Sequence, residues 1–124
     1  MEGPLRTRVK TGVSSIAATV EWDERPQRSS YPAVVLETVD AQRTQNMDGF
    51  DTFRPTLMQF NCFATNKTTA INLREAVIAA ITPEATVGGT RFLRAQGVEH
   101  RPRNENTDTG FVHCEIVEAT IWHD

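Results

Sequence analysis

The chain has 124 residues, which is enough for one domain and too few for two ordinary ones, so we expect residues 1–124 to form a single domain. Its 13 Lys and Arg residues against 16 Asp and Glu residues give a net charge of −3, which argues against bulk binding to nucleic acid. No apolar run approaches the roughly 20 residues of a membrane helix. The N-terminus lacks the apolar core of a secretory signal, so we expect a protein of the cytoplasm that has no contact with a membrane.

Apolar residues at steps of four and three predict a first helix that starts near Pro4 and carries one buried stripe. The stripe is Leu5, Val9, Val13, Ile16 and Val20. A polar connection over residues 23–30 follows, and the β-branched run after Pro32 predicts a strand over residues 31–39. Residues 40–52 are polar and form the first long excursion. Connections of more than about 12 residues are usually functional or disordered.

The middle of the chain predicts a strand followed by a helix. Residues 56–65 alternate as a strand does, with Met58, Phe60, Cys62 and Ala64 on one face. A helix over residues 67–81 follows, capped by Asn66 or Thr68 and stopped by Pro83. Its predicted buried stripe is Ala70, Leu73, Val77, Ala80 and Ile81.

The last third predicts two more strands. Gly88-Gly89 favours a plain turn over a phosphate-binding loop, because no Lys-Ser/Thr pair follows it. Residues 90–99 predict a strand, residues 101–109 a second polar excursion, and residues 111–122 a long closing strand. The apolar parity of this closing strand switches between Ile116 and Val117, which indicates a bulge or a change in the surface it packs against.

The predicted element order is therefore α-β-β-α-β-β. This order favours an α+β fold in which a mainly antiparallel sheet packs against two helices and carries two long hairpin loops.

Residues that carry chemistry are few. Cys62 and Cys114 sit in apolar strand-like runs and are expected to be reduced core residues. His113 and Glu115 can share one strand face, but a metal site needs more ligands than these two, and none cluster nearby. Without a nucleophile elbow or a cofactor loop, we expect no enzyme and no catalytic, cofactor or metal residues. His113 and His123 receive no role.

The two polar excursions carry the residues predicted to make assembly contacts. From the first excursion these are Arg43, Met47, Phe50 and Phe53, and from the second His100, Arg101 and Arg103. Isolated apolar residues in a polar loop either fold back onto their own domain or meet a partner. Solvated loops are an equally good interpretation of any one of these residues.

With these elements in place, the chain resembles the tail-completion (tail-terminator) proteins of long-tailed bacteriophages and phage-like gene transfer agents. The resemblance runs from about Leu5 to Ile121. It rests on Pro4-Leu5-Arg6, on Tyr31-Pro32-Ala33-Val34-Val35-Leu36, on a strand ending at Ala64-Thr65-Asn66, on Leu73-Arg74-Glu75-Ala76-Val77, and on the closing strand.

The resemblance implies a structural virion protein that assembles into a ring of six copies. Such a ring caps the head-proximal end of the tail tube, stops tube polymerisation and joins the tail to the head connector. The implied partners are further copies of the chain, the tail tube protein and a head-completion protein. DNA would pass through the lumen without specific binding, which an acidic chain suits. Assembly would take place in the host cytoplasm.

Two other interpretations remain open. The chain can be a head-completion or neck connector protein of the same particle, which shares the small α+β architecture. In a different class, it can be a small ligand-binding or enzymatic domain in which a sheet and two helices enclose a pocket.

Overall fold

The computed structural model describes residues 2–16, 18–22, 32–41, 45–46, 49–50, 54–107 and 110–124. Its helical elements are α1 (Glu2–Gly12), the 3₁₀ turn η1 (Ser14–Ile16) and α2 (Lys67–Ile81). Its strands are β1 (Thr19–Trp22), β2 (Ala33–Ala41), β3 (Gln45–Asn46), β4 (Gly49–Phe50), β5 (Arg54–Ala64), β6 (Ala85–Val87), β7 (Thr90–Phe92), β8 (Gln96–Pro102), β9 (Glu105–Thr107) and β10 (Gly110–His123). The described part is therefore an α+β fold with two α-helices, as predicted.

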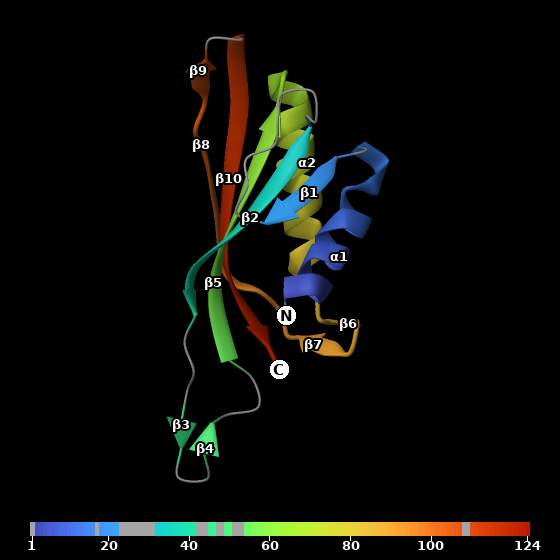
Figure 1. Cartoon of the computed structure of the whole chain (residues 1–124), viewed down its shortest axis with the longest axis vertical. Helices are drawn as coiled ribbons and strands as arrows, with labels where there is room; N and C mark the ends of the chain where they lie inside the picture. The colour runs from blue at the N-terminus through green and yellow to red at the C-terminus, as the bar shows by residue number, and fades with distance from the viewer. Residues whose placement is uncertain are drawn as a thin grey trace.

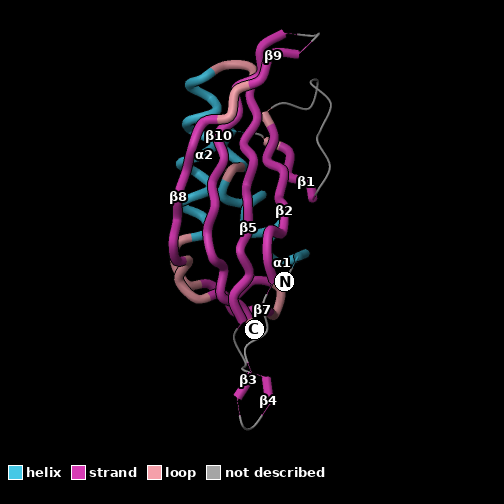
Figure 2. Tube along the Cα trace, turned by 90° about the vertical axis from the view of Figure 1, so that its left-hand side faces the viewer, coloured by secondary structure: helices cyan, strands magenta, loops and turns pink. Residues whose placement is uncertain are grey.

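The main sheet runs β1-β2-β5-β10, and the second edge of β10 pairs in turn with β9, β8 and β7. Both helices lie on one side of this sheet (Figure 1), and Figure 2 views the sheet with β2 and β8 on opposite sides of β5 and β10. The sheet is mixed, because β1 runs parallel to β2 whereas β2, β5 and β10 are antiparallel neighbours. The predicted α-β-β-α-β-β order misses β1 and divides the later strands differently.

The first helix ends earlier than the apolar spacing predicts. It stops at Gly12, η1 follows, and Val20 lies in β1 rather than in the helix. Gly12, Ser14 and Ser15 are weak helix formers, and three of the four residues of β1 are β-branched or aromatic, which suits a strand. The prediction of one helix reaching Val20 is therefore wrong, although Val20 is buried in the same core as Leu5.

The second helix has the predicted bounds. The Asn66 side chain accepts a hydrogen bond from the Thr69 backbone N–H at 2.8 Å, which caps the N-terminus. At the other end, the Thr82 hydroxyl donates to the Ile78 carbonyl at 2.6 Å just before Pro83. Of the predicted stripe, Ala70, Leu73, Val77 and Ile81 are buried and Ala80 is half-buried.

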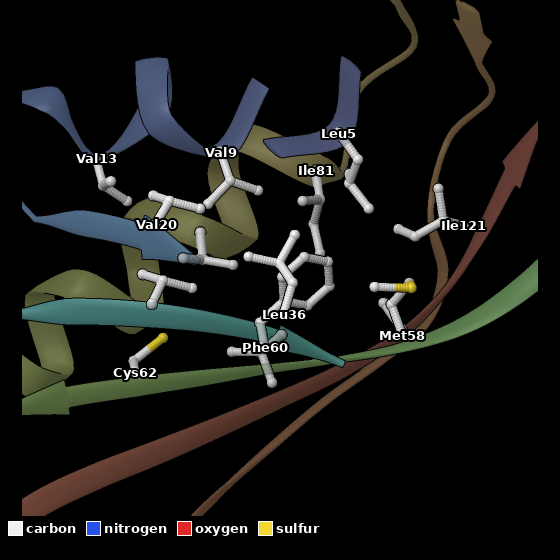
Figure 3. Close-up of a cluster of buried hydrophobic side chains, with 14 of the residues drawn as sticks. Leu5, Val9, Val13, Val20, Leu36, Met58, Phe60, Cys62, Ile81 and Ile121 are labelled. Carbon is white, nitrogen blue, oxygen red and sulfur yellow. The ribbon is translucent and has the colours of Figure 1, made fainter. Parts of the chain in front are cut away.

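The main core fills the space between the helices and the sheet. Figure 3 shows the side chains that meet there: Leu5, Val9, Val13, Val20, Leu36, Met58, Phe60, Cys62, Ile81 and Ile121. Full burial of an aliphatic or aromatic side chain of this size contributes about 1.5–3 kcal/mol. A smaller buried cluster contains Val35, Phe63, Val112, Cys114 and Ile116.

The closing strand contributes to both clusters. Val117, Ala119 and Ile121 point into the main core, whereas Val112, Cys114 and Ile116 point to the opposite face and the smaller cluster. The pairing of β10 with β5 is unbroken from His113 to His123, so the predicted parity switch is a change of packing surface and not a bulge. The irregularity in β10 pairing lies between Glu118 and Thr120, opposite β8.

The strand predicted over residues 90–99 is two strands. β7 ends at Phe92 and β8 begins at Gln96, and the predicted polar excursion over residues 101–109 contains the end of β8 and all of β9. The turn at Gly88-Gly89 is confirmed, because both residues have positive φ (56° and 83°) and join the β6–β7 hairpin. Glycine adopts this conformation without the steric penalty that a side chain brings.

Gly12 sets how closely the helices approach. A Cβ atom at Gly12 would lie 2.5 Å from the Ala80 Cβ in α2, too close for any real contact. We expect Gly12→Ala to lower the free energy of unfolding by about 1–3 kcal/mol, as overpacking does. Chemical denaturation measures the loss. The combination with Ala80→Gly removes the clash and should lose less stability than the two single changes added together.

Gly3→Ala is the matched control, because Gly3 also lies in α1 but a Cβ there meets nothing within 4 Å. It should leave stability unchanged or raise it by up to about 1 kcal/mol through helix propensity. If Gly12→Ala proved as neutral as this control, the account of helix packing would be wrong.

Candidate functional site

The structure places three of the predicted contact residues together. His100 and Arg101 lie on β8 and Arg103 directly follows it, and all three are exposed. From the first excursion, Phe50 lies in β4, which pairs with β3. The other three, Arg43, Met47 and Phe53, lie outside the described residues. The contact role of all seven stays a prediction.

A groove of about 430 Å³ opens beside His100 and Arg101. We call it the α2–β8 groove, because its walls come from the first half of α2 and from β8 with the turn after it, and one β10 residue completes it. Its lining residues are Lys67, Ile71, Arg74, His100, Arg101, Pro102, Asn104 and Glu115. Segments far apart in the chain therefore meet at one surface.

Three of the eight residues that line the groove are cations. Lys67 is exposed at the start of α2, and Arg101 Nη1 donates to Glu118 Oε1 at 3.1 Å. Arg74 reaches two carboxylates, since its guanidinium lies 2.8 Å from Glu75 Oε1 and 3.7 Å from Glu115 Oε2. Three Lys and Arg residues therefore line the groove beside one lining carboxylate, Glu115, and two of these cations are ion-paired with Glu75 and Glu118 just outside the lining.

Glu115 is the buried group of the groove. Only 6% of the residue is exposed, and its Oε2 atom has no hydrogen-bond partner among the described residues. The guanidinium of Arg74, 3.7 Å away, is its ion-pair partner. A buried carboxylate without a nearby cation is strongly destabilising, so Glu115 holds Arg74 across the helix–sheet junction.

His123 at the end of β10 has a structural place. It is buried, and its Nε2 lies 2.8 Å from the Thr56 hydroxyl on β5. Arg8 of α1 is also buried; it donates to the Pro83 carbonyl and its guanidinium lies 5.3 Å from the centre of the Phe92 ring. Burial lowers the pKa of Arg8. Both groups tie the ends of elements together and lie away from the groove lining.

Neither Cys62 nor Cys114 forms a disulfide, and both are buried, as predicted. Burial raises the pKa of the Cys62 thiol, with smaller contributions from Cys114 and Glu115, and Arg74 opposes them. A thiol in such surroundings is a poor nucleophile because little thiolate forms.

Across the described residues there is no group of three or more His, Cys, Asp and Glu side chains suited to a metal ion. Neither helix in that part of the chain is long and apolar enough to cross a bilayer.

Sequence reasoning missed Lys67, Arg74, Asn104 and Glu115 as members of the site. One signal was present, because Lys67, Ile71 and Arg74 recur at steps of four and three and so share a helix face. That face differs from the buried stripe of α2. Only the pairing of β8 with β10 brings this face together with residues 100–104 and 115.

Comparison with known proteins rests on structure. No family model matches the sequence, and no curated protein is significantly similar to it. A chain in the solved structure described as the virion of a native gene transfer agent particle superposes with a TM-score of 0.65 and 12% identity, covering 100% of this chain and 95% of that chain. A second solved structure matches with a TM-score of 0.60 and 10% identity, covering 100% and 96%. The whole chain therefore shares its fold with a chain of a virion.

The ion pair between Arg74 and Glu115 gives a stability prediction. Arg74→Met keeps most of the apolar stem but leaves the Glu115 carboxylate buried without its cation. We expect a loss of about 3 kcal/mol in the free energy of unfolding. Adding Glu115→Gln removes the stranded charge and should recover part of that loss, which a double-mutant cycle by denaturation measures.

Glu75→Gln is the control, because Glu75 is exposed and also pairs with Arg74. Exposed pairs contribute less than about 1 kcal/mol, so this change should be nearly neutral. Strictly additive effects of the Arg74 and Glu115 changes would contradict the coupling.

Proposed function

We propose that this chain is a structural, non-enzymatic protein of a phage-like virion. The observation that carries the proposal is the superposition of the entire chain on a chain of a gene transfer agent virion, with a TM-score of 0.65. Further support comes from the surface, where the described part offers a groove with charged walls between α2 and β8. The sequence resemblance to tail-completion proteins points the same way.

Within that class, we propose the role of a tail terminator. Six copies form a ring at the head-proximal end of the tail tube, stop its polymerisation and present a surface to the head connector. The lumen carries DNA without binding it specifically, which the net charge of −3 favours. The contacts are made by the exposed residues of the second excursion, His100, Arg101 and Arg103, and by the first excursion.

Deletion of the gene from cells that make the particle tests this role. A tube that lacks its terminator keeps polymerising, so we expect tails of uncontrolled length in negative-stain images. Expression of the wild-type chain from a plasmid should restore a single tail length. Deletion of the tube protein gene is the control, since it should remove tails altogether.

Two other outcomes would contradict the terminator role. Tails of normal length that remain unattached to heads would assign the chain to the neck. The second outcome is that the deletion leaves the particles unchanged and still infectious or transfer-competent, while the purified chain turns over or specifically binds a small molecule. That result would assign the chain to a ligand-binding or enzymatic class.

A further inference from the structure

The outer edge of β8 is open. Within the described residues, β8 pairs with β10 along one side and with no strand along the other. The backbone N–H of Arg103 donates to the Cys114 carbonyl of β10 at 2.7 Å. Because the backbone groups of an antiparallel pair alternate in direction, those of Arg101 also point toward β10, and those of its two neighbours point outward. The open edge therefore offers the N–H and C=O of His100 and the C=O of Pro102.

The edge is regular at these two residues. From Glu99 to Pro102, each β8 residue lies opposite one β10 residue without a break, and the irregular pairing is confined to the start of the strand. Pro102 has no N–H to offer, and proline within a sheet is typical of an edge strand. An added strand therefore has three backbone hydrogen bonds available here, two at His100 and one at Pro102.

The α2–β8 groove runs beside the same stretch of edge. His100 and Pro102 lie opposite Val117 and Glu115 of β10, so their side chains point to the helix side of the sheet, where they line the groove. α2 forms the inner wall of the groove, and β8 lies at the margin of the sheet (Figure 2). Neighbouring strands lie about 4.8 Å apart, so a strand added to β8 stands about 10 Å from β10 and supplies an outer wall.

The groove suits a neutral hydrogen-bond donor. Glu115 is 6% exposed and lines the groove, and its Oε2 atom accepts no hydrogen bond from the described residues. The three lining cations are balanced by Glu115 and by the ion-pair partners Glu75 and Glu118, which gives a local charge of 3 − 3 = 0. A phosphate therefore meets no excess of positive charge, and a further cation would lie beside Arg74. A long neutral donor such as a Gln side chain fits Oε2 without either conflict.

The other described edges of this chain are poor donors of such a strand. At the far end of the sheet, the Arg6 guanidinium already donates to the outward Val20 carbonyl of β1 at 2.9 Å. β2 extends beyond β1, but its pairing is irregular between Thr38 and Asp40, and bulges of this kind protect an edge from strand addition. β3, β4, β6 and β9 have only two or three residues each. The strand that completes β8 is therefore expected from a different protein and not from a second copy.

We infer that an extended segment of a different virion protein adds as a strand to the open edge of β8 and places one side chain in the α2–β8 groove. Backbone hydrogen bonds to His100 and Pro102 supply affinity, and the groove selects the side chain. Side chains of directly opposed residues share a face, so the residue opposite His100 or Pro102 is the one that reaches Glu115. That the partner belongs to a virion rests on the proposed function, whereas the strand addition follows from the edge and the groove.

One backbone N–H tests the added strand. His100→Pro removes the outward N–H without removing a hydrogen bond between β8 and β10, whereas His100→Ala keeps the N–H and measures the share of the side chain. Each variant is expressed from a plasmid in particle-producing cells that lack the gene, and quantitative mass spectrometry counts the copies of the chain in each purified particle. We expect the Pro variant to be incorporated at least about tenfold less than the Ala variant, because the partner carbonyl is left without its donor.

The groove is tested separately from the backbone of β8. Ile71→Trp places a larger side chain in the groove, and Asn72→Trp places the same side chain at an exposed position of α2 outside the lining. Only Ile71→Trp should reduce the number of copies in each particle. This pair decides the question even if His100→Pro lowers the thermal stability of the chain.

A photo-crosslinking amino acid in place of Lys67 identifies the partner, because Lys67 is exposed on the groove wall. In assembled particles we expect a crosslink to one segment of a different virion protein. Crosslinks between two copies of this chain would overturn the choice of partner. Normal incorporation of both His100→Pro and Ile71→Trp would overturn the site itself.

Incorporation and tail length are separate readouts. Loss of the His100→Pro and Ile71→Trp chains from particles, with normal tails in the deletion strain, would keep the added strand and reject the terminator role. Uncontrolled tails in the deletion strain, with full incorporation of every variant, would do the reverse. Particles that lack the wild-type chain would reject both.

Discussion

The fold depends on how β10 distributes its side chains between the two faces of the sheet. Its second half points Val117, Ala119 and Ile121 into the core beneath the helices, whereas its first half points Cys114 and Ile116 to the other face. The two helix-facing positions just before Val117, His113 and Glu115, are polar. At that end α2 meets Glu115 and an ion pair rather than an apolar surface, and the groove opens there. One change of parity in one strand therefore produces both the second buried cluster and the charged groove.

The same strand also lies near the middle of the main sheet. β10 and β5 form the longest pairing in the sheet and hold β2 on one side and β8 on the other.

Local patterns predicted the strongly periodic elements and their partners in the core. α2 has its predicted bounds because its stripe, its Asn66 cap and Pro83 all agree, and β10 follows its apolar run. The first helix was predicted to be too long, because Ile16 and Val20 are four residues apart, as on one face of a helix. The same spacing arises when the chain leaves the helix and places Val20 in the same core from a strand. The parallel β1–β2 pair and the groove depend on contacts between segments that are far apart in the chain. The local periodicity of the sequence carries no information about such contacts. His100 and Arg101 were singled out because they lie at the second polar excursion, whereas Glu115 was considered only as a metal ligand beside His113, since nothing local indicates that it meets α2.

The most direct measurement is a cryo-electron microscopy map of particles from cells that carry this gene, with the chain fitted into the density at the junction of head and tail. The account predicts one ring of six copies at the head-proximal end of the tube. The account would be contradicted if neither the density nor mass spectrometry of the particles detected this chain. It would also be contradicted if the chain lay outside the junction of head and tail.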